Sequence, residues 1–269
     1  MTLYPALFVT HGGGPLPLLG DPGHAALVDA LKRHRKDLET RFGLPKKIVV
    51  ISAHYETTSL SVGGGTQPKM LYDYYGFPAE SYKLQYPAPG EPSLAKDIVD
   101  ALKMEGIPAD MDIHRPFDHG VFIPLMIMFP EAKIPVVPVS VLRSGDPAKH
   151  IKIGKALRSF RSRGVLFLGS GATMHNFSNF NKRNAGTKFG DSLSSVLCAN
   201  DNVMSTEKRL EKMIHASEMD GFDEAQPRGA LEHLMPLLTL VGVANGTRGE
   251  EVASVRVDGV NVRNYIFPN

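Results

Sequence analysis

Hydrophobic residues occur along this chain in two alternating patterns. Short uninterrupted apolar runs, such as residues 48–51 and 165–168, are typical of strands that are buried on both faces. Longer stretches with apolar residues three or four positions apart, as at Leu27, Leu31 and Leu38, are typical of amphipathic helices. The runs predict strands at 6–10, 48–53, 109–113, 135–142, 165–168, 252–257 and 262–267. The spaced pattern predicts helices at 22–42, 92–104, 121–128, 147–162, 190–217 and 230–243.

The order of these elements predicts an α/β fold. We expect a single domain, residues 1–269, with a central mixed β-sheet flanked by helices on both faces. The first strand, the helix after it and the second strand imply a parallel pair with a right-handed crossover. Asp258-Gly259 is the turn expected of an antiparallel hairpin between the last two strands. The prolines of 135–142 suggest an edge strand or irregular pairing, and Pro236 either kinks the helix at 230–243 or lies in its first turn.

The segment from Gly63 to Gly90 follows neither pattern. It contains one phenylalanine and five tyrosines, Phe77, Tyr72, Tyr74, Tyr75, Tyr82 and Tyr86. A structureless stretch of this length inside a compact domain is usually a functional cover. Its aromatic rings suit a flat apolar ligand, and they are equally suited to packing the segment onto the body of the protein.

Composition and charge narrow the class of partner. Thirty Lys and Arg against twenty-eight Asp and Glu give a net charge of +2 without a basic block, so we expect no nucleic acid and no membrane surface as partner. The single cysteine, Cys198, excludes an intrachain disulfide and fits a reducing compartment. No secretory signal pattern is visible, and the longest strongly apolar run, 234–244, is shorter than the about 20 residues of a membrane helix. We expect a cytoplasmic protein with a small-molecule partner, and the oligomeric state stays open.

The histidines carry the candidate chemistry. Five of the ten lie in polar helical stretches or in a loop, where an exposed or hydrogen-bonded imidazole is the ordinary case: His24, His34, His114, His150 and His215. His11, His54 and His175 instead follow predicted strands, and ligands bind at the carboxyl ends of strands in open α/β sheets. Burying several imidazoles, with His119 and His233 among them, costs several kcal/mol unless they are paired, and a bound divalent cation offsets that cost. Their spacing matches no known short metal motif.

Two other kinds of site fit the sequence poorly. Gly12-Gly13-Gly14 follows a strand and precedes a helix, but it lacks the Lys-Ser/Thr of a phosphate loop and the glycine spacing of a dinucleotide fingerprint. Gly169-Ser170-Gly171 is out of register with the Gly-x-Ser-x-Gly of serine hydrolases. A nucleotide site and a serine nucleophile are therefore disfavoured.

Five segments occur in the order expected of one protein family. They are Thr10-His11-Gly12-Gly13-Gly14-Pro15, Ile51-Ser52-Ala53-His54-Tyr55-Glu56, Asp118-His119-Gly120 followed by Pro124-Leu125, Gly169-Ser170-Gly171-Ala172-Thr173-Met174-His175-Asn176 and Glu232-His233-Leu234-Met235-Pro236-Leu237. With these segments the sequence resembles the class III extradiol ring-cleavage dioxygenases of the LigB type, and most of all their DOPA 4,5-dioxygenase branch. The likeness extends over nearly the whole chain, and five co-linear motifs are far more specific than any one of them.

The resemblance implies a non-haem metal centre that acts on a small aromatic catechol and dioxygen and opens the ring. It implies Fe(II), with Zn(II) at the same site in some cases, held by His11, His54 and His233. His175 is then the acid–base residue and His119 lines the pocket. Other members of the superfamily use two histidines and a glutamate, so Glu232 is an alternative third ligand, although the nearer branch favours His233.

Two further functions fit the same residues. Three histidines and a water also form the site of a zinc-dependent hydrolase. A non-catalytic binding protein of the same fold would need no redox chemistry, although all five histidine positions are filled here. Metal dependence and oxygen uptake distinguish these alternatives from a dioxygenase.

Overall fold

A computed structural model describes residues 3–268, and within them one sheet contains eight strands. The strands are β1 (Ala6–Thr10), β2 (Lys47–Thr57), β3 (Leu60–Gly63), β4 (Ala109–Asp112), β5 (Val136–Leu142), β6 (Val165–Gly171), β7 (Glu250–Val257) and β8 (Val260–Phe267). Their order across the sheet is β4-β3-β5-β2-β6-β1-β8-β7. The predicted strands are all present, and the short β3 is an addition that the sequence patterns did not indicate.

The sheet is mixed, as predicted. β1, β2, β5 and β6 form its parallel centre, and β3 and β8 run antiparallel to their neighbours β5 and β1. The hairpin of β7 and β8 turns at Asp258 and Gly259 as expected. The predicted pairing of the first two strands is wrong, because β6 lies between β1 and β2 and pairs with both.

β5 lies inside the sheet, so its expected place at an edge is wrong, although its irregular pairing is confirmed. Its only bridge to β3 joins Val139 and Val62, and its register with β2 shifts between Ser52 and Glu56. Pro138 is tolerated there because Gly63 has no side chain: a Cβ on Gly63 would lie 2.5 Å from the proline ring. An interior proline thus depends on a glycine in the next strand.

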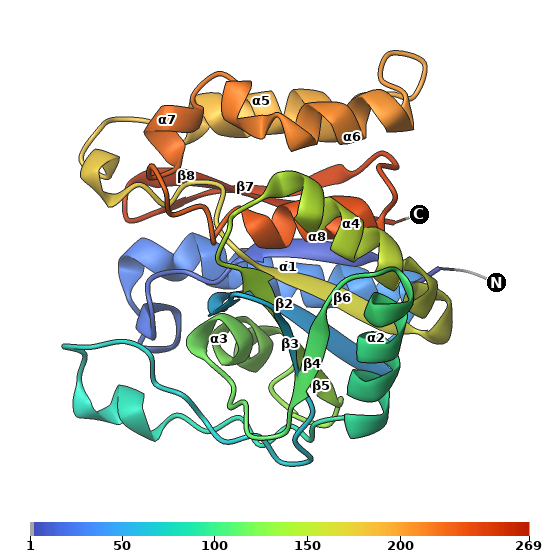
Figure 1. Cartoon of the computed structure of the whole chain (residues 1–269). Helices are drawn as coiled ribbons and strands as arrows, with labels where there is room; N and C mark the ends of the chain where they lie inside the picture. Colours follow the sequence, from blue (N-terminus) through green and yellow to red (C-terminus); the bar gives the residue numbers. More distant parts are fainter. Residues whose placement is uncertain (1–2, 269) are drawn as a thin grey trace.

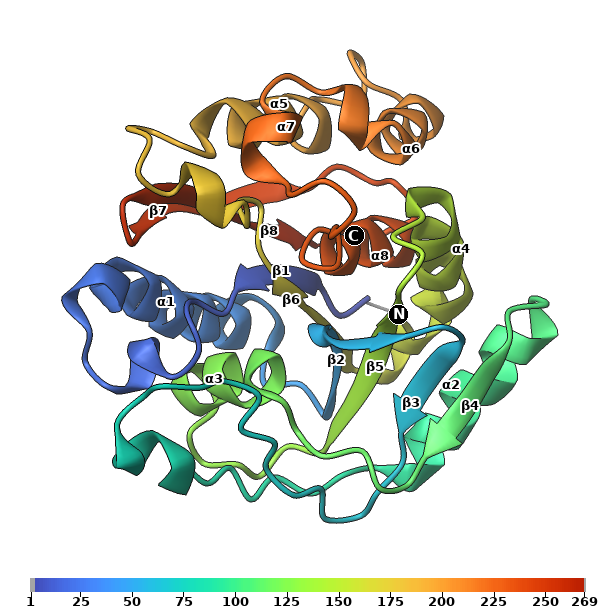
Figure 2. The same ribbon diagram turned by 60° about the vertical axis from the view of Figure 1, so that its left-hand side comes forward.

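Eight helices pack around the sheet within the described part of the chain. They are α1 (Ala25–Phe42), α2 (Pro92–Met104), α3 (His119–Met128), α4 (Pro147–Leu157), α5 (Thr187–Leu197), α6 (Thr206–Ile214), α7 (Phe222–Ala225) and α8 (Met235–Val243). α1 and α3 lie together on one face of the sheet, and α4 and α8 lie on the other (Figure 2). α5, α6 and α7 form a separate layer beyond the β7–β8 hairpin (Figure 1). Helices on both faces confirm the predicted α/β architecture.

Two helical predictions need correction at their boundaries. The stretch 190–217 forms two helices, α5 and α6, with turns between them. The helix expected at 230–243 begins only at Met235, because the residues before it form turns. Pro236 therefore lies in the first turn of α8, where its missing N–H has no helical partner to lose, and it does not kink the helix.

α8 is the most deeply buried helix beside the candidate site. All nine of its residues are buried, and it packs on β6 and against α4. The contact with α4 is close because Gly242 has no side chain: a Cβ there would lie 2.1 Å from the carbonyl oxygen of Ile151. The segment that leads into α8 is thus fixed by the core.

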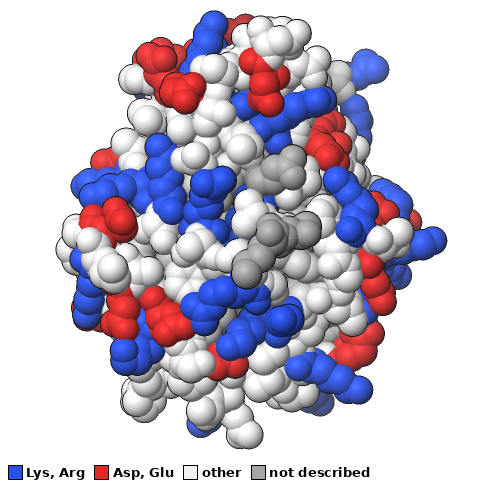
Figure 3. Space-filling model, turned by 90° about the vertical axis from the view of Figure 1, so that its right-hand side faces the viewer, with Lys and Arg blue, Asp and Glu red and all other residues white. Residues whose placement is uncertain are grey.

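The surface carries charges of both signs. Groups of Lys and Arg lie beside groups of Asp and Glu on the face shown in Figure 3, in keeping with a net charge of only +2. Among the described residues, no helix combines the length and the apolar character that crossing a membrane requires.

Candidate metal centre

Three of the predicted histidines meet at the carboxyl end of the parallel strands. His11 directly follows β1, His54 lies in the outer part of β2, and His233 lies two residues before α8. The Nε2 atom of His54 is 3.1 Å from that of His11 and 3.2 Å from that of His233. Side chains from distant parts of the sequence therefore form one cluster.

His54 is directed into the cluster by an irregularity in β2. The sequence predicted that this strand ends at His54, but it continues to Thr57. The pairing register with β5 shifts between Ser52 and Glu56, and such bulges redirect side chains. Ser52 steadies this turn of the backbone, since its Oγ accepts the His54 N–H at 3.2 Å and donates to Asp118 at 2.6 Å.

His233 is held by direct contact between backbones. The N–H of Ala172 donates to the carbonyl oxygen of His233 at 2.9 Å. A Cβ on Gly171 would lie 2.2 Å from the same oxygen, so the approach requires glycine at the end of β6. The Gly-Ser-Gly sequence of β6 thus serves the placement of His233 and not a nucleophilic serine.

Each of the three rings has an oxygen partner on its other nitrogen, Nδ1. The partners are Ser170 for His11, Glu232 for His233 and Asp73 for His54, at 2.9, 2.9 and 3.3 Å. The carboxylates can only accept, and the Ser170 hydroxyl can accept, so these partners suit a ring proton on Nδ1 and a lone pair on Nε2. The Nε2 of His54 then faces those of His11 and His233 across about 3 Å, and ligand atoms of all three histidines lie within 4.8 Å of one another.

Burial keeps these imidazoles neutral. Burial lowers the pKa of His11 and of His233 well below 6.5, and the neighbouring imidazoles lower both further. Burial likewise lowers the pKa of His54 to about 3. Protonation therefore does not relieve the facing lone pairs, whereas a cation does. Imidazole nitrogens about 2.1 Å from one cation lie about 3 Å apart, so this donor set fits a divalent metal ion.

His119 and His175 adjoin the cluster through different histidines, His54 and His233. His119 is the first residue of α3, which Asp118 caps by accepting the Val121 N–H, and its ring centroid is 3.8 Å from that of His54. The ring of His175 stacks on that of His233, with centroids 3.3 Å apart and planes 16° apart. Burial lowers the pKa of His175 to about 4. Both histidines are thus placed beside the converging nitrogens.

Glu232 lies behind His233, away from the converging nitrogens. Its Oε1 is 2.9 Å from the Nδ1 of His233 and 3.6 Å from the Nδ1 of His175. The imidazole of His233, and not the carboxylate, therefore faces His54. Burial raises the pKa of Glu232, and the charge of Glu56 raises it further.

Asp73 is the residue that the sequence analysis missed. It lies in the tyrosine-rich segment, and its Oδ1 is 2.8 Å from the Nδ1 of His119. Burial favours a raised pKa for Asp73, but its hydrogen bonds and its attraction to His119 and His54 outweigh burial and lower it. Only a lone carboxylate between Tyr72 and Tyr74 marked this position, and such a signal is weak.

The other histidines take no part in the cluster. Three of them are buried and hydrogen-bonded: His24 to Asp21 and the Gly13 N–H, His34 to Asn264, and His150 to the Leu142 N–H. His114 and His215 are exposed. These five have the ordinary environments that their sequence positions indicated.

The tyrosine-rich segment packs onto the body of the protein near the cluster. The Tyr74 ring is buried and lies 5.9 Å from the ring of His119, and the Tyr72 ring lies 6.2 Å from that of Phe122 in α3. Tyr75, in contrast, is 88% exposed. Most of these rings therefore hold the segment in place, which was one of the two expected roles.

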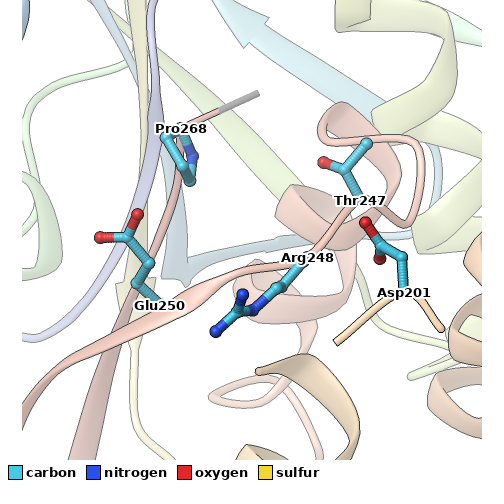
Figure 4. A pocket seen from close by; sticks show the side chains of 5 residues that line it. All are labelled: Asp201, Thr247, Arg248, Glu250 and Pro268. Carbon is cyan, nitrogen blue, oxygen red and sulfur yellow. The ribbon is translucent and has the colours of Figure 1, made fainter. Parts of the chain in front are cut away.

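A pocket elsewhere on the molecule contains none of the histidines. It has a volume of about 460 Å³ and is lined by Asp201, Thr247, Arg248, Glu250 and Pro268 (Figure 4). Glu250 already pairs with Arg41 at 2.9 Å, and the Nε of Arg248 donates to the carbonyl oxygen of Cys198. Its lining shows no group of side chains suited to catalysis, so the histidine cluster is the better candidate site.

Comparison with known proteins gives consistent matches. Residues 5–268 match the family described as the catalytic LigB subunit of aromatic ring-opening dioxygenase. The chain is 36% identical to the dioxygenase tasH of Hapsidospora irregularis, over 99% of this chain and 86% of that protein. It is 35% identical to a 4,5-DOPA dioxygenase extradiol of Beta vulgaris, over 80% of this chain and 79% of that protein.

Bacterial proteins show the same likeness. The chain is 30% identical to the 4,5-DOPA dioxygenase extradiol of Escherichia coli (strain K12), over 97% of this chain and 92% of that protein. The crystal structure of an uncharacterized protein from Escherichia coli K12 superposes with a TM-score of 0.76 at 26% identity. That match covers 98% of this chain and 99% of the other, so the two share the whole fold.

Proposed function

Because the chain belongs to the LigB family of aromatic ring-opening dioxygenases, we propose that it is a metal-dependent extradiol dioxygenase of catechol-type substrates. Relatives named as dioxygenases support an oxidoreductase that uses dioxygen. The observation that carries the proposal is the set of three neutral imidazoles whose Nε2 lone pairs converge.

His11, His54 and His233 are the proposed ligands, with Fe(II) as the expected cation and Zn(II) as an alternative at the same site. The bound cation would supply coordination positions that hold both hydroxyl oxygens of a catechol beside dioxygen. The site is accessible to such reactants, because the side chains of His54 and His175 are 23% and 20% exposed. We assign Glu232 to the support of His233 and not to the metal.

His175 is the proposed acid–base residue. A catechol must lose a proton before it can chelate a cation, and a neutral imidazole at physiological pH can accept that proton. Burial lowers the pKa of His175 to about 4, so the ring is neutral at physiological pH and has a lone pair for the proton. Glu232, 3.6 Å from its Nδ1, would stabilise the positive charge that the ring then carries until the proton returns to the product.

His119 is the proposed second pocket residue. Its Nδ1–H is bound by Asp73 at 2.8 Å, which leaves Nε2 to accept a hydrogen bond from a substrate hydroxyl. Its ring also packs against that of His54. We therefore expect His119 to orient the catechol relative to the proposed ligands.

The test is oxygen uptake by protein that has been loaded with Fe(II) under anaerobic conditions. Uptake is measured with a panel of catechols, and one dioxygen consumed per ring opened is the expected result. Absence of uptake with every catechol, together with hydrolysis of an ester or amide by the Zn(II) form, would replace the proposal with a zinc hydrolase. Absence of both activities would favour a binding protein.

A further inference from the structure

We propose that Asp73 is a positioning residue that orients His54 and His119 through the two oxygens of one carboxylate. The inference rests on the proposed function, because it concerns the centre to which these two histidines belong. It also gives the tyrosine-rich segment a role beyond that of a cover.

The contacts of Asp73 are divided between its two oxygens. Oδ1 accepts the backbone N–H of His119 at 3.0 Å and the Nδ1–H of its ring at 2.8 Å. Oδ2 lies 3.3 Å from the Nδ1 of His54. Only 20% of the Asp73 side chain is exposed, so water competes little with these contacts.

This division determines which nitrogen of each ring is free. An ionised carboxylate only accepts hydrogen bonds, so the His119 ring carries its proton on Nδ1, and the negative charge 3.3 Å from the Nδ1 of His54 favours the proton on that nitrogen as well. The Nε2 of His54 is then free for a cation, and the Nε2 of His119 is free for a substrate hydroxyl. One carboxylate thus sets the tautomer of a proposed ligand and of a proposed substrate-binding histidine.

The backbone around Asp73 is fixed by its neighbours in the segment. The Tyr72 hydroxyl donates to the carbonyl oxygen of Leu84, and the Tyr74 hydroxyl donates to that of Ser81, each at 2.7 Å. These bonds close the segment on itself on both sides of Asp73.

The segment is also bound to the residues that lead into α3. Met70 forms a parallel bridge with Phe117, and the Phe117 N–H donates to the carbonyl oxygen of Lys69 at 2.8 Å. The Leu71 N–H returns a bond of 2.8 Å to the carbonyl oxygen of Phe117. The carboxylate therefore reaches His119 from a backbone that is paired with the start of the same helix.

Asparagine is the informative substitution at this position. It has the shape of aspartate, but its single acceptor oxygen can serve only one of the two histidines, and its NH₂ group opposes the N–H of the other. Asp73→Asn is expected to lower the affinity for Zn(II), measured by titration calorimetry, by about 10- to 100-fold. It is also expected to shift the visible absorption bands of the Co(II) form and to lower kcat more than it changes the KM for catechol.

Glu80→Gln is the matched control, because Glu80 is an exposed carboxylate on the same segment. It should leave affinity, spectrum and kcat unchanged. An Asp73→Asn protein that binds Zn(II) as tightly as the parent and keeps its Co(II) spectrum would overturn the proposal. If Asp73→Asn weakens Zn(II) binding while even the parent takes up no oxygen with any catechol, the positioning role stands and the proposed function fails.

A measurement on the unsubstituted protein avoids any question of folding. Nitrogen NMR of the imidazole side chains reports which ring nitrogen carries the proton, a feature that the structure assigns only through its hydrogen bonds. His54 and His119 are both expected to be Nδ1–H tautomers in the metal-free protein. An Nε2–H tautomer at either histidine would overturn the proposal.

Discussion

Two groups of side chains with the same composition face each other in the candidate centre, and they differ in what supports them. Each group has one carboxylate and two histidines: Asp73 with His54 and His119, and Glu232 with His233 and His175. We call them the Asp73 triple and the Glu232 triple. Each contains one proposed ligand and one proposed catalytic or substrate-binding histidine.

The carboxylate of the Asp73 triple comes from a long segment with little regular structure, whereas Glu232 immediately precedes His233 and the fully buried α8. The contacts also differ, since Asp73 approaches its two histidines with different oxygens, at 2.8 and 3.3 Å, whereas Glu232 approaches both of its histidines with Oε1, at 2.9 and 3.6 Å. The two triples therefore have similar side chains, but one carboxylate is held by a segment that packs onto the surface of the body and the other by a segment that leads into a buried helix.

Removal of one proposed ligand from each triple should have the largest effect. His54→Ala and His233→Ala are both expected to lose bound metal, with affinity reduced by far more than the about 100-fold limit typical of residues that only support a ligand. Turnover should fall to background in both. Metal content of the purified proteins measures the loss.

The control for these ligand variants is His215→Ala, because His215 is an exposed histidine outside the centre. It should retain the metal. A His54→Ala protein that binds iron as tightly as the parent would show that His54 is not a ligand.

The second effect separates the two histidines that are not proposed as ligands. His175→Ala is expected to keep its metal and to lose about 10²- to 10⁴-fold in kcat, because proton transfer by a positioned side chain contributes that much. His119→Ala should also keep its metal but mainly raise the KM for catechol. Steady-state kinetics and metal analysis of both variants measure these effects. If the two variants showed the same changes in kcat and KM, the proposed division of roles would be wrong.

Acid should lower the stability of the protein through His34, which is linked by Asn264 to the end of β1. Its Nε2 accepts a hydrogen bond of 3.0 Å from Asn264, whose oxygen accepts the Thr10 N–H beside His11. Burial lowers the pKa of His34 from 6.5 to about 4, so the unfolded chain binds the proton more readily between these values. The stability that depends on neutral His34 is fully present above pH 6.5. About 3 kcal/mol of the free energy of unfolding is lost as the pH falls to about 4.

His34→Gln tests this prediction, because glutamine keeps an acceptor for Asn264 and has no titrating group. Denaturant unfolding of the metal-free variant should depend less on pH between 6.5 and 4 than that of the parent. Equal slopes would assign the acid sensitivity to other groups, including the triples themselves.

The next effect compares the two carboxylates. Glu232→Gln is expected to lower Zn(II) affinity by about 10-fold, because glutamine retains one acceptor for the single close contact to His233. That loss should be no greater than the loss in Asp73→Asn. If Glu232→Gln instead abolished metal binding, Glu232 would be a ligand and the two triples would not be equivalent.

The smallest effect should be confined to the Asp73 triple. Tyr74→Phe removes the hydroxyl bond to the carbonyl oxygen of Ser81, which is expected to cost about 1 kcal/mol of stability and to weaken metal binding slightly. Tyr86→Phe is the control, since it removes a comparable buried bond to Phe129 away from Asp73. Both should destabilise the protein to a similar extent by thermal melting, but only Tyr74→Phe should change metal affinity.

Much of the fold could be predicted because its elements have strong local signals. The apolar run at 165–168 identified β6, and Asp258-Gly259 identified the closing hairpin. Strand neighbours could not be predicted, because nothing local shows that β6 pairs between β1 and β2. The interior place of β5 was missed for a similar reason, since its proline is accommodated by Gly63, a residue of another strand.

The candidate site was predictable where its residues lie in distinctive segments. His11, His54 and His175 follow apolar runs, and the structure brings them together with His119 and His233. Asp73 was not predictable, because an aspartate in a segment without periodicity carries no local sign of its partners. Its contacts arise from the docking of that segment beside α3, which is a property of the assembled fold.

The strand order also governs when the centre can form during protein synthesis. β1 leaves the ribosome first, but both of its neighbours, β6 and β8, follow only after residue 164. Contacts between residues so far apart along the chain form late in folding. A growing polypeptide that has not yet reached residue 233 contains His11 and His54 but not His233, so the proposed three-histidine site can be completed only once nearly the whole polypeptide has been translated.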